Sequence, residues 1–523
     1  MLDALRHSLR LIHAARVLAR HDALFPFDLM RELPPALKLA KMIAGLRLPG
    51  ERTSAETREP RPGIRLARAL ESLGPSFIKL GQALATRPDV VGVEVSEDLT
   101  ELQDRLAPFP GPQARATIEE QFGQPIDALF TDFDDQPVAA ASIAQVHFAV
   151  TTEGREVAVK VLRPDIEAAF ERNLETYFWL ARMIERAQPA AALRLRPVDV
   201  VRTLSQTVHR EMDLRLEAAA ASELKENMAG DSGIVIPDVD WSRTSRRVLT
   251  TARVSGIPIG DRAAIIAAGH DAAAIATKAV QVFLIQALRD GFFHADMHPG
   301  NLFVDANGDL VAVDFGIMGR LDRPTRRYLG EILLGFLEAD YVKVARIHFE
   351  AGYVPRSHSV AAFAQALRSV GEPIFGRPVH EISLGRLLAQ LFRVTEHFDM
   401  KTQPQLLLLQ KTMVMVEGLA NHLDSHANMW EISRPVIEGW VRESLGPEAR
   451  LMAAAERTIS LVARLPALIE RLDEAGRGLI EDGLKLHPDS LDELARRQAE
   501  RRRPLTAALW ALVGVALILL LAG

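Results

Sequence analysis

The sequence contains no cysteine among its 523 residues. This absence excludes disulfide bonds, cysteine-based zinc sites, iron–sulfur clusters and thiol catalysis. An excess of basic residues is also lacking, because 62 Lys and Arg stand against 68 Asp and Glu. Proteins that bind nucleic acid by neutralising phosphates normally carry such an excess, so we expect no nucleic-acid partner.

Two further absences narrow the possible functions. The first 24 residues contain no continuous apolar stretch followed by a small-residue cleavage site, so a secretory signal peptide is not expected. No glycine fingerprint for a dinucleotide follows a predicted strand, and no cluster of metal ligands is evident. The pattern therefore argues against an oxidoreductase or hydroxylase. With 48% hydrophobic and 25% charged residues, the composition is that of a globular protein.

The N-terminal segment has helical periodicity. Apolar residues from Leu5 to Leu18 recur at helical spacing, and arginines lie largely elsewhere on the helix. We expect a helix that packs on the body of the protein; the alternative is a basic amphipathic helix on a membrane surface. The Pro- and Arg-rich stretch over residues 50–63 predicts an exposed linker.

Two β-hairpins are predicted in a chain whose pattern is otherwise mostly helical. The first joins residues 145–150 to 157–161 through a turn at Glu153 and Gly154, and the second joins 302–304 to 310–313. The remaining predicted elements are helices from Pro164 to Ala187 and from Pro197 to Met228, strands near 233–239 and 246–254, and an almost wholly helical region after Asp261.

The last 19 residues, 505–523, carry no charge and include ten Leu, Ile or Val. A helix of this length spans about 28 Å, close to the hydrocarbon thickness of a bilayer. Arginines at 496, 497, 501, 502 and 503 precede it directly and would keep the body in the cytoplasm by the positive-inside rule. We therefore predict a tail-anchored protein of the inner (cytoplasmic) membrane; the alternative is a buried core helix.

The densest chemical signal is His-Ala-Asp-Met-His-Pro-Gly-Asn at 294–301, followed after a hairpin by Asp-Phe-Gly at 314–316. This order and spacing is typical of phosphoryl-transfer enzymes of the protein-kinase type. Mg²⁺ prefers oxygen ligands, and Asn301 and Asp314 would supply them. Asp296 would face the group that loses its proton. The sequence predicts a nucleotide and Mg²⁺ site.

A phosphate-binding lysine and a glutamate partner are expected upstream. Lys160 ends an apolar run on a predicted strand, and a following helix offers Glu211, Asp213 and Glu217. On one continuous helix Glu211 and Glu217 would point about 120° apart, so a single lysine could hardly engage both. Two acids therefore imply two partners, and Asp213 and Glu217 share a face.

The hairpin expected to cover the phosphates lacks the glycine-rich loop of protein kinases. An alanine-rich segment, Val138 to His147, takes its place. Because the Cβ of alanine restricts positive φ, this loop should be less flexible and present its amides differently. The chain departs from an ordinary kinase at this point.

Together these motifs resemble the atypical kinase family called UbiB or ADCK, and the bacterial UbiB branch in particular. The resemblance also rests on Lys79-Leu80-Gly81-Gln82, the KxGQ motif, and runs from about Leu66 to Asp424. It implies support of ubiquinone (coenzyme Q) biosynthesis. Bacterial relatives usually carry two C-terminal spans, whereas this chain has room for one.

The resemblance also assigns roles to positions of this chain. Catalytic roles are implied for Asp296, Lys160 and Glu217, and Mg²⁺ ligation for Asn301 and Asp314. The KxGQ extension would occlude the site through Lys79, Gln82, Glu211 and Asp213. ATP and Mg²⁺ are the implied cofactors. Nucleotide contacts are implied for Lys160 and for Ala139, Ala140, Ala141, Ser142, Ile143, Ala144, Gln145 and Val146.

The expected fold class is α+β, a bilobal protein-kinase-like fold with a helical KxGQ extension, a mostly helical C-terminal lobe and a C-terminal transmembrane helix. Length alone would suggest three or four domains, but the motifs favour one large kinase-like unit. The expected regions are an N-terminal helix and linker (1–63), the KxGQ extension (64–130), an N-lobe (131–260), a C-lobe (261–440), C-terminal helices (441–504) and the anchor (505–523).

Three functions fit these motifs. The leading hypothesis is a membrane-attached ATPase or small-molecule kinase that handles polyprenylphenol-type lipid precursors or assembles the ubiquinone-biosynthesis enzymes. A protein kinase acting in trans is the second, although an occluded groove would disfavour peptide substrates. A nucleotide-binding scaffold without catalysis is the third. The expected partners are biosynthetic enzymes, lipid precursors, the membrane and a second copy of the chain as a homodimer.

Overall fold

The structure is a computed structural model that describes residues 2–21, 61–85, 91–99, 107–187, 196–372 and 403–445, with isolated residues between these ranges. Residues Met1–Val441 form one compact unit, and a second unit begins at Arg442. The predicted linker over 50–63 lies almost entirely outside the described residues, and the predicted membrane segment at 505–523 lies wholly outside them.

The first sheet is antiparallel and has the strand order β1–β3–β4–β6, with β2 paired to the start of β3. It contains the predicted hairpin over residues 145–161, whose strands and turn position are confirmed and in which Val146 pairs with Lys160. The alanine-rich segment supplies β2 and the first four residues of β3. The strands are β1 (Phe130–Phe133), β2 (Ala139–Ala140), β3 (Ala144–Thr151), β4 (Glu156–Leu162) and β6 (Val248–Ala252).

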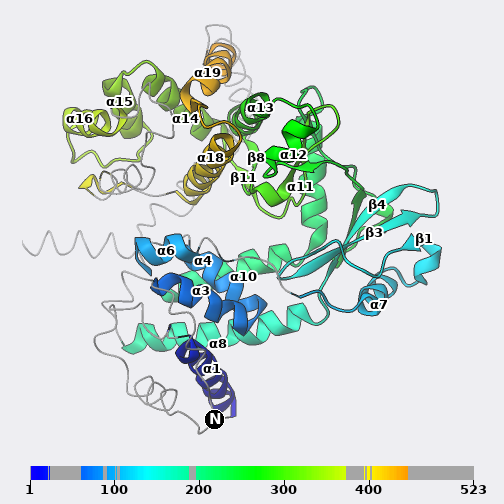
Figure 1. Ribbon diagram of the computed structural model, residues 1–523. Coiled ribbons are helices and arrows are strands. Elements are labelled where there is room, and N and C mark those ends of the chain that lie inside the picture. The colour runs from blue at the N-terminus through cyan, green and yellow to red at the C-terminus, as the bar shows by residue number, and fades with distance from the viewer. Residues whose placement is uncertain are drawn as a thin grey trace, which may run out of the picture. The chain divides into compact units, whose positions relative to one another are not determined.

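Strand alternation in β4 determines where Lys160 points. Val157, Val159 and Val161 are buried together in a cluster that α7 (Gly111–Phe122) helps to form. Figure 1 shows α7 beside this sheet. Because successive side chains of a strand alternate between faces, Lys160 points to the opposite face. There it meets α11 (Leu214–Asn227), which carries its partner Glu217.

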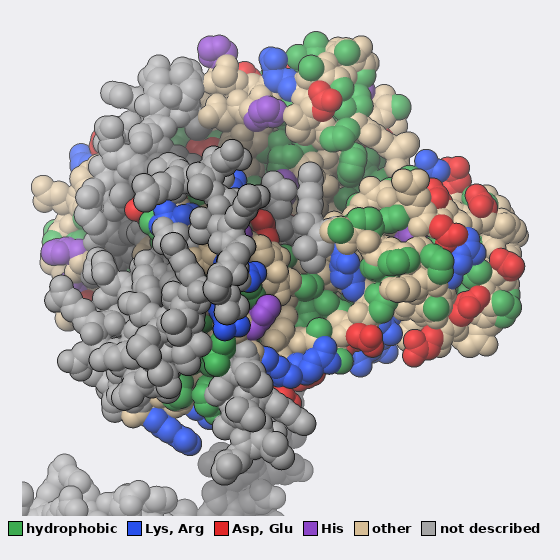
Figure 2. All heavy atoms as spheres, turned by 60° about the horizontal axis from the view of Figure 1, so that its bottom comes forward, with side chains coloured by type: hydrophobic (Ala, Val, Ile, Leu, Met, Phe, Trp, Pro, Cys, Tyr) green, Lys and Arg blue, Asp and Glu red, His purple; other side chains and the backbone are tan. Residues whose placement is uncertain are grey.

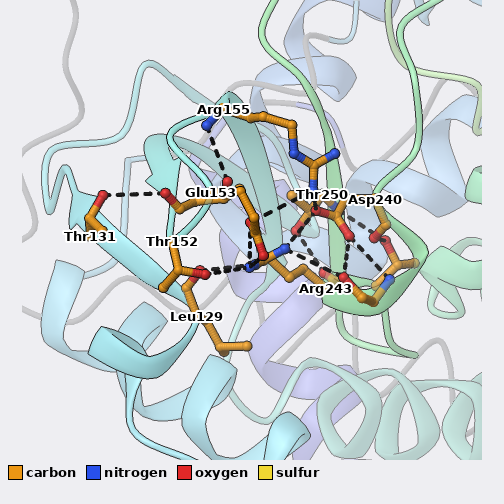
Figure 3. A network of polar contacts seen from close by, with 11 residues as sticks. Leu129, Thr131, Thr152, Glu153, Arg155, Asp240, Arg243 and Thr250 are labelled. Atoms are coloured by element: carbon orange, nitrogen blue, oxygen red, sulfur yellow. Dashed lines mark hydrogen bonds and ion pairs between the residues drawn. The ribbon is translucent and has the colours of Figure 1, made fainter.

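A buried arginine fixes the outer end of the same sheet (Figure 3). Arg243, which is 6% exposed, donates to Asp240 Oδ2, to both carboxylate oxygens of Glu153 and to the carbonyl of Leu129, all at 2.9 Å. Arg155 adds a 2.8 Å contact to Asp240. The hydrogen bonds from Arg243 lower the pKa of Glu153 to about 2. The network joins the β3–β4 turn to the start of β1 and to the segment before β6.

The predicted helix from Pro197 to Met228 is wrong as a single element. The structure has α10 (Pro197–Glu211) and α11 (Leu214–Asn227), separated at Met212 and Asp213. Asp213 adopts an extended backbone and its side chain accepts a hydrogen bond from Arg215 N, as an N-cap does. The preceding helix prediction, Pro164 to Ala187, is confirmed as α8 (Ile166–Ala187).

The KxGQ motif lies on α4 (Pro75–Ala85), in a small helical layer with α3 (Pro62–Leu73) and α6 (Val93–Leu99). Leu66, Leu70, Ile78 and Leu99 form its core, with Leu18 of α1 (Leu2–Arg20) packed against it. The N-terminal helix therefore packs on the body, as expected. The opposite side of α4 places Phe77, Leu80 and Ala83 against a second cluster that contains residues of α8, α10 and α11.

The C-terminal half is built around one apolar helix. α13 (Ala272–Ile285) continues into the π-helical turn η3 (Gln286–Asp290) and packs against α18 (Pro404–Leu423) in the largest core cluster. Among the described residues, Ala272–Asp290 is the one helix long and apolar enough to cross a membrane. The most apolar 18-residue stretch of this helix is 61% buried within the protein. Such burial identifies the helix as a core element.

Short strands frame the motifs of the C-terminal half. The predicted hairpin over 302–313 is confirmed as β9 and β10, which join a four-stranded sheet of order β5–β10–β9–β7. A second, two-stranded sheet pairs β8 with β11, although the sequence pattern predicted no strand at either place. The strands are β5 (Ile234–Val235), β7 (Ile257–Pro258), β8 (Phe292–His294), β9 (Leu302–Val304), β10 (Leu310–Ala312) and β11 (Met318–Arg320).

Figure 2 shows acidic and basic side chains interspersed over the end of the molecule formed by the first sheet and α7.

The remaining elements lie in both halves. The other helices and turns are η1 (Ile126–Ala128), η2 (Trp241–Arg243), α12 (Arg262–Ala267), η4 (Pro299–Asn301), α14 (Arg323–Leu337), α15 (Tyr341–Glu350), α16 (Val360–Gly371) and α19 (Met429–Leu445).

Candidate active site

Three predicted residues from distant parts of the chain meet around one ammonium group. Lys160 Nζ lies 2.8 and 2.9 Å from the carboxylate oxygens of Glu217 and 3.2 Å from Asp314 Oδ2. The side chains of Lys160 and Glu217 are 16% and 8% exposed, whereas that of Asp314 is 45% exposed. One lysine thus bridges a buried glutamate and a more open aspartate.

The electrostatics of this triad follow from its unequal burial. Burial alone would lower the pKa of Lys160, but the charges of Asp314 and Glu217 raise it above its usual value. Burial raises the pKa of Glu217. Burial also opposes ionisation of Asp314, but Lys160 outweighs it and lowers the pKa of that carboxyl to about 2. Asp314 is therefore ionised at neutral pH and is the more accessible anion.

Local backbone geometry aims Asp314 and anchors the loop behind it. Asp314 has a φ of 61°, a left-handed conformation that aspartate tolerates better than most residues. Its Oδ1 accepts a hydrogen bond from Gly316 N at 3.1 Å. Phe315 N donates to Glu217 Oε1 at 3.3 Å. The Asp-Phe-Gly segment is thereby tied to the same glutamate that holds Lys160.

The second pair of predicted residues lies on the loop between β8 and β9. Asn301 Nδ2 donates to Asp296 Oδ2 and to the Asp296 carbonyl, both at 3.0 Å. Because the side-chain nitrogen of Asn301 is used in this way, its side-chain oxygen Oδ1 remains to bind another group. Val313 N donates to the backbone carbonyl of Asn301 at 2.9 Å, so this loop and the strand leading to Asp314 are joined.

A buried histidine supports both loops, and the sequence pattern gave it no role of its own. His294 is 1% exposed, and its Nδ1 accepts from Asp296 N at 3.1 Å. Its ring lies 5.7 Å from that of Phe315. Gln286 Oε1, from the π-helical turn, accepts from His294 N at 3.0 Å. Burial lowers the pKa of His294. The sequence signal for this supporting role is the position of His294 two residues before Asp296, which lets its ring accept a hydrogen bond from the Asp296 backbone.

The alanine-rich segment forms a strand and an inward-folded turn. Ala139 and Ala140 pair with Val146 and Gln145, and none of the residues 138–146 has a positive φ. This agrees with the restriction expected from alanine. At the tip, Ser142 is fully buried and Ile143 is 9% exposed. The backbone of residues 139–146 stays a predicted nucleotide contact.

The predicted occluding residues fall into two groups. Lys79 Nζ contacts Glu211 Oε2 at 2.8 Å, with side-chain exposures of 10% and 12%. Asp213 pairs with Arg215 instead, and Gln82 lies one turn after Lys79 on α4. Glu211 and Glu217 therefore have separate lysine partners. The reason differs from the predicted one, because the helix breaks between the two glutamates.

The donor set is suited to a nucleotide with Mg²⁺. Asp314 offers an ionised carboxylate and Asn301 an amide oxygen, and Mg²⁺ is commonly held by one or two such ligands plus phosphate oxygens and water. The described residues contain no group of three or more His, Asp or Glu that would hold a metal without such additional ligands. Lys160 would supply the positive charge that a phosphate chain requires.

The sheet, the lysine–glutamate pair and the two acidic loops define a protein-kinase-like fold. Residues 101–348 match the ABC1 atypical kinase-like domain, and residues 367–428 match the UbiB helical domain. The chain belongs to the ABC1/UbiB family of atypical kinases, as the motifs indicated.

Individual relatives support the same assignment over most of the chain. "Probable protein kinase UbiB" of Marinobacter nauticus is 41% identical, with 91% of this chain and 85% of the relative covered. Its namesake in Xanthomonas campestris pv. campestris (strain B100) is 40% identical, with 94% and 88% covered. Among solved structures, the complex of Rv3197 with erythromycin from Mycobacterium tuberculosis has a TM-score of 0.51 and 26% identity, covering 70% of this chain and 93% of that one.

Proposed function

We propose that this protein binds ATP with Mg²⁺ and turns it over as an ATPase or small-molecule kinase that supports ubiquinone biosynthesis at the inner (cytoplasmic) membrane. The observation that carries the proposal is that carboxylate oxygens of Glu217 and Asp314 both lie within 3.2 Å of the Lys160 ammonium group. Asp296 and Asn301 lie on a loop that is hydrogen-bonded to Val313, the residue before Asp314. Family membership and the names of the UbiB relatives point the same way.

Each residue has a distinct proposed task. Lys160 binds the phosphate chain and is held in place by Glu217. Asp314 and Asn301 ligate Mg²⁺, which would neutralise charge on the phosphate oxygens. Asp296 accepts the proton of the attacking hydroxyl or water. Its hydrogen bond from Asn301 orients the carboxylate for this task.

The proposed acceptor is water or a lipid precursor of polyprenylphenol type. The KxGQ helix α4 packs against the same cluster as Ile143, at the tip of the alanine-rich turn, through Phe77 and Leu80. An extension that packs against the same cluster as the alanine-rich turn restricts the room for a peptide, which favours a small phenolic group or water.

Membrane attachment is part of the proposal and rests on the uncharged sequence at 505–523. Deleting these residues should move the protein from the membrane fraction to the supernatant. If the deleted form remains in washed membranes to the same extent as the full chain, the tail is not the anchor.

The test of the proposed activity is ATP turnover by the full chain, with and without liposomes that contain a phenolic quinone precursor. We expect Mg²⁺-dependent turnover that rises with the precursor and is lost in Asp296→Asn. Phosphate appearing on a protein partner would favour a protein kinase. Full support of ubiquinone synthesis in cells by an Asp296→Asn variant that still binds ATP would favour a scaffold.

A further inference from the structure

The alanine-rich turn is fastened from behind by a segment that is far from it in sequence. We call residues 138–144 the covering turn and residues 107–110 the strap. The strap precedes α7 and follows the helical layer of α3, α4 and α6, which carries the KxGQ motif and is called the helical extension below. Phe109 packs against the cluster under the first sheet, so the strap has a fixed position on the sheet.

Arg163, the residue directly after β4, joins the covering turn to the strap. Its Nε and Nη2 donate to the Ala141 carbonyl at 3.1 and 2.9 Å. Nη2 also donates to the Ala107 carbonyl at 3.0 Å. The guanidinium lies 5.6 Å from the centroid of the Phe109 ring. A planar, multiply donating cation is suited to bridging two carbonyls beside an aromatic ring.

Gln145 forms a second link from the other end of the covering turn. Its Oε1 accepts from Phe109 N at 2.9 Å, and its Nε2 donates to the Phe109 carbonyl at 3.1 Å. Gln145 Nε2 also lies 2.9 Å from His147 Nε2, and His147 Nδ1 donates to the Asp134 carbonyl at 2.7 Å. The side chain of Gln145 is 1% exposed and fully occupied by these partners.

The helical extension and the covering turn share one buried cluster. Phe77 and Leu80 of α4 pack against the cluster that contains Ile143 of the turn. A displacement of the extension would therefore change the packing around the turn.

We propose that Arg163 and Gln145 are positioning residues that couple the helical extension to the nucleotide site by holding the covering turn to the strap. The proposal rests on the proposed function, in which the covering turn lies over the nucleotide. Holding the turn in one conformation before binding lowers the entropy lost on binding, so the links raise nucleotide affinity. The backbone of the turn then responds to the position of the extension.

The experiment measures two quantities in the full chain: hydrogen exchange of residues 138–144 without nucleotide, and the Kd of ATP with Mg²⁺. Arg163→Met keeps the aliphatic stem and removes the donors. We expect about tenfold faster exchange in the turn and about five- to tenfold weaker nucleotide binding. Gln145→Met should act in the same direction. Arg163→Lys should be intermediate, because one ammonium replaces a planar fork.

Arg262→Met is a control from the C-terminal half. Arg262 lies on α12, and its Nε donates to the Leu423 carbonyl at 2.8 Å, so it too is an arginine that binds a distant backbone carbonyl. We expect it to leave both quantities at the wild-type values. Equal effects of Arg163→Met and Arg262→Met would overturn the proposal, as would unchanged exchange in Arg163→Met.

Failure of the coupling and failure of the proposed function give different results. If the wild-type protein binds no nucleotide, the proposed function fails, while the exchange experiment still reports on the links. If the wild type binds and Arg163→Met exchanges faster yet binds ATP with unchanged affinity, the turn is held but is not coupled to the nucleotide site, which overturns the inference alone.

Discussion

At the scale of single residues, the site depends on Lys160, which contacts two carboxylates that differ in burial. Glu217 is buried and Asp314 is open, although both lie within 3.2 Å of Lys160 Nζ. Two carboxylates competing for one cation separate in pKa according to burial, so the open one remains ionised. Glu217 is thereby suited to hold the lysine and Asp314 to exchange it for a metal ion.

Enclosed histidines make stability depend on pH. Burial lowers the pKa of His147, His294 and His348. As the pH falls through about 6.5, these histidines take up protons in the unfolded chain but not yet in the folded protein. The stability that the neutral histidines contribute is therefore complete above pH 6.5 and declines below it. We expect the free energy of unfolding to fall between pH 7 and pH 5.5, by at most about 1.4 kcal/mol per pH unit for each histidine.

His348 offers a variant to test this dependence. Its Nδ1 donates to the Val344 carbonyl, and its ring packs edge-on at 5.3 Å from that of Phe363. His348→Phe preserves the aromatic packing and removes one titrating group. Denaturant unfolding across this pH range should show a shallower pH dependence for the variant. Curves that run parallel would contradict the assignment.

At the scale of elements, the break between α10 and α11 is the feature that organises the acidic residues. Glu211 ends α10, Asp213 caps α11 and Glu217 lies in the first turn of α11. A continuous helix was predicted because the apolar spacing runs on through Met212. The aspartate before Leu214 is an N-cap signal, but such signals are weak within a segment of good helix formers.

Loss of this cap should affect both stability and the site. We expect Asp213→Ala to lower the free energy of unfolding by about 1 kcal/mol and to weaken binding of ATP with Mg²⁺, because the first turn of α11 positions Glu217. Asp271→Ala removes the equivalent cap of α13, where Asp271 Oδ1 accepts from Ala273 N at 2.9 Å. This control should lose similar stability without weakened binding. Equal binding losses would show a general effect of destabilisation.

Much of the local structure could be predicted from sequence, and the reasons are local. Both hairpins were predicted because short apolar runs rich in Val, Leu and Phe flank turn residues such as Gly154 and Gly308. β8 and β11 were missed because no short turn joins them, whereas β9 and β10, which are equally short, flank one. The pairing of β8 with β11 places His294 opposite Met318 and Phe292 opposite Arg320, a juxtaposition that no local pattern encodes.

At the scale of the whole molecule, the motifs predicted which residues meet but not how the extension is attached. The lysine–glutamate pairs follow from family motifs that already contain both partners. The links from Arg163 to Ala107 and from Gln145 to Phe109 join segments 56 and 36 residues apart. Hydrogen bonds from side chains to distant backbone atoms leave no pattern in a single sequence, so they became evident only in the structure.

The contact between Lys79 and Glu211 joins the KxGQ extension to α10 and provides a test at this scale. Both side chains are largely buried, so removing the Lys79 ammonium deprives the buried Glu211 carboxylate of this partner. Lys79→Met should lower the free energy of unfolding by about 3 kcal/mol. The double variant Lys79→Met with Glu211→Leu should recover much of this loss. A double variant no more stable than the single one would contradict a paired, buried contact.

The central claim is that Lys160, Glu217, Asp314, Asp296 and Asn301 form one Mg²⁺-dependent nucleotide site. The most direct measurement is calorimetric titration of ATP into the full chain with and without Mg²⁺, for the wild type and Asp314→Asn. We expect binding by the wild type that requires Mg²⁺ and is lost or weakened at least tenfold in Asp314→Asn. Mg²⁺-dependent binding of equal affinity in the two proteins would contradict the account.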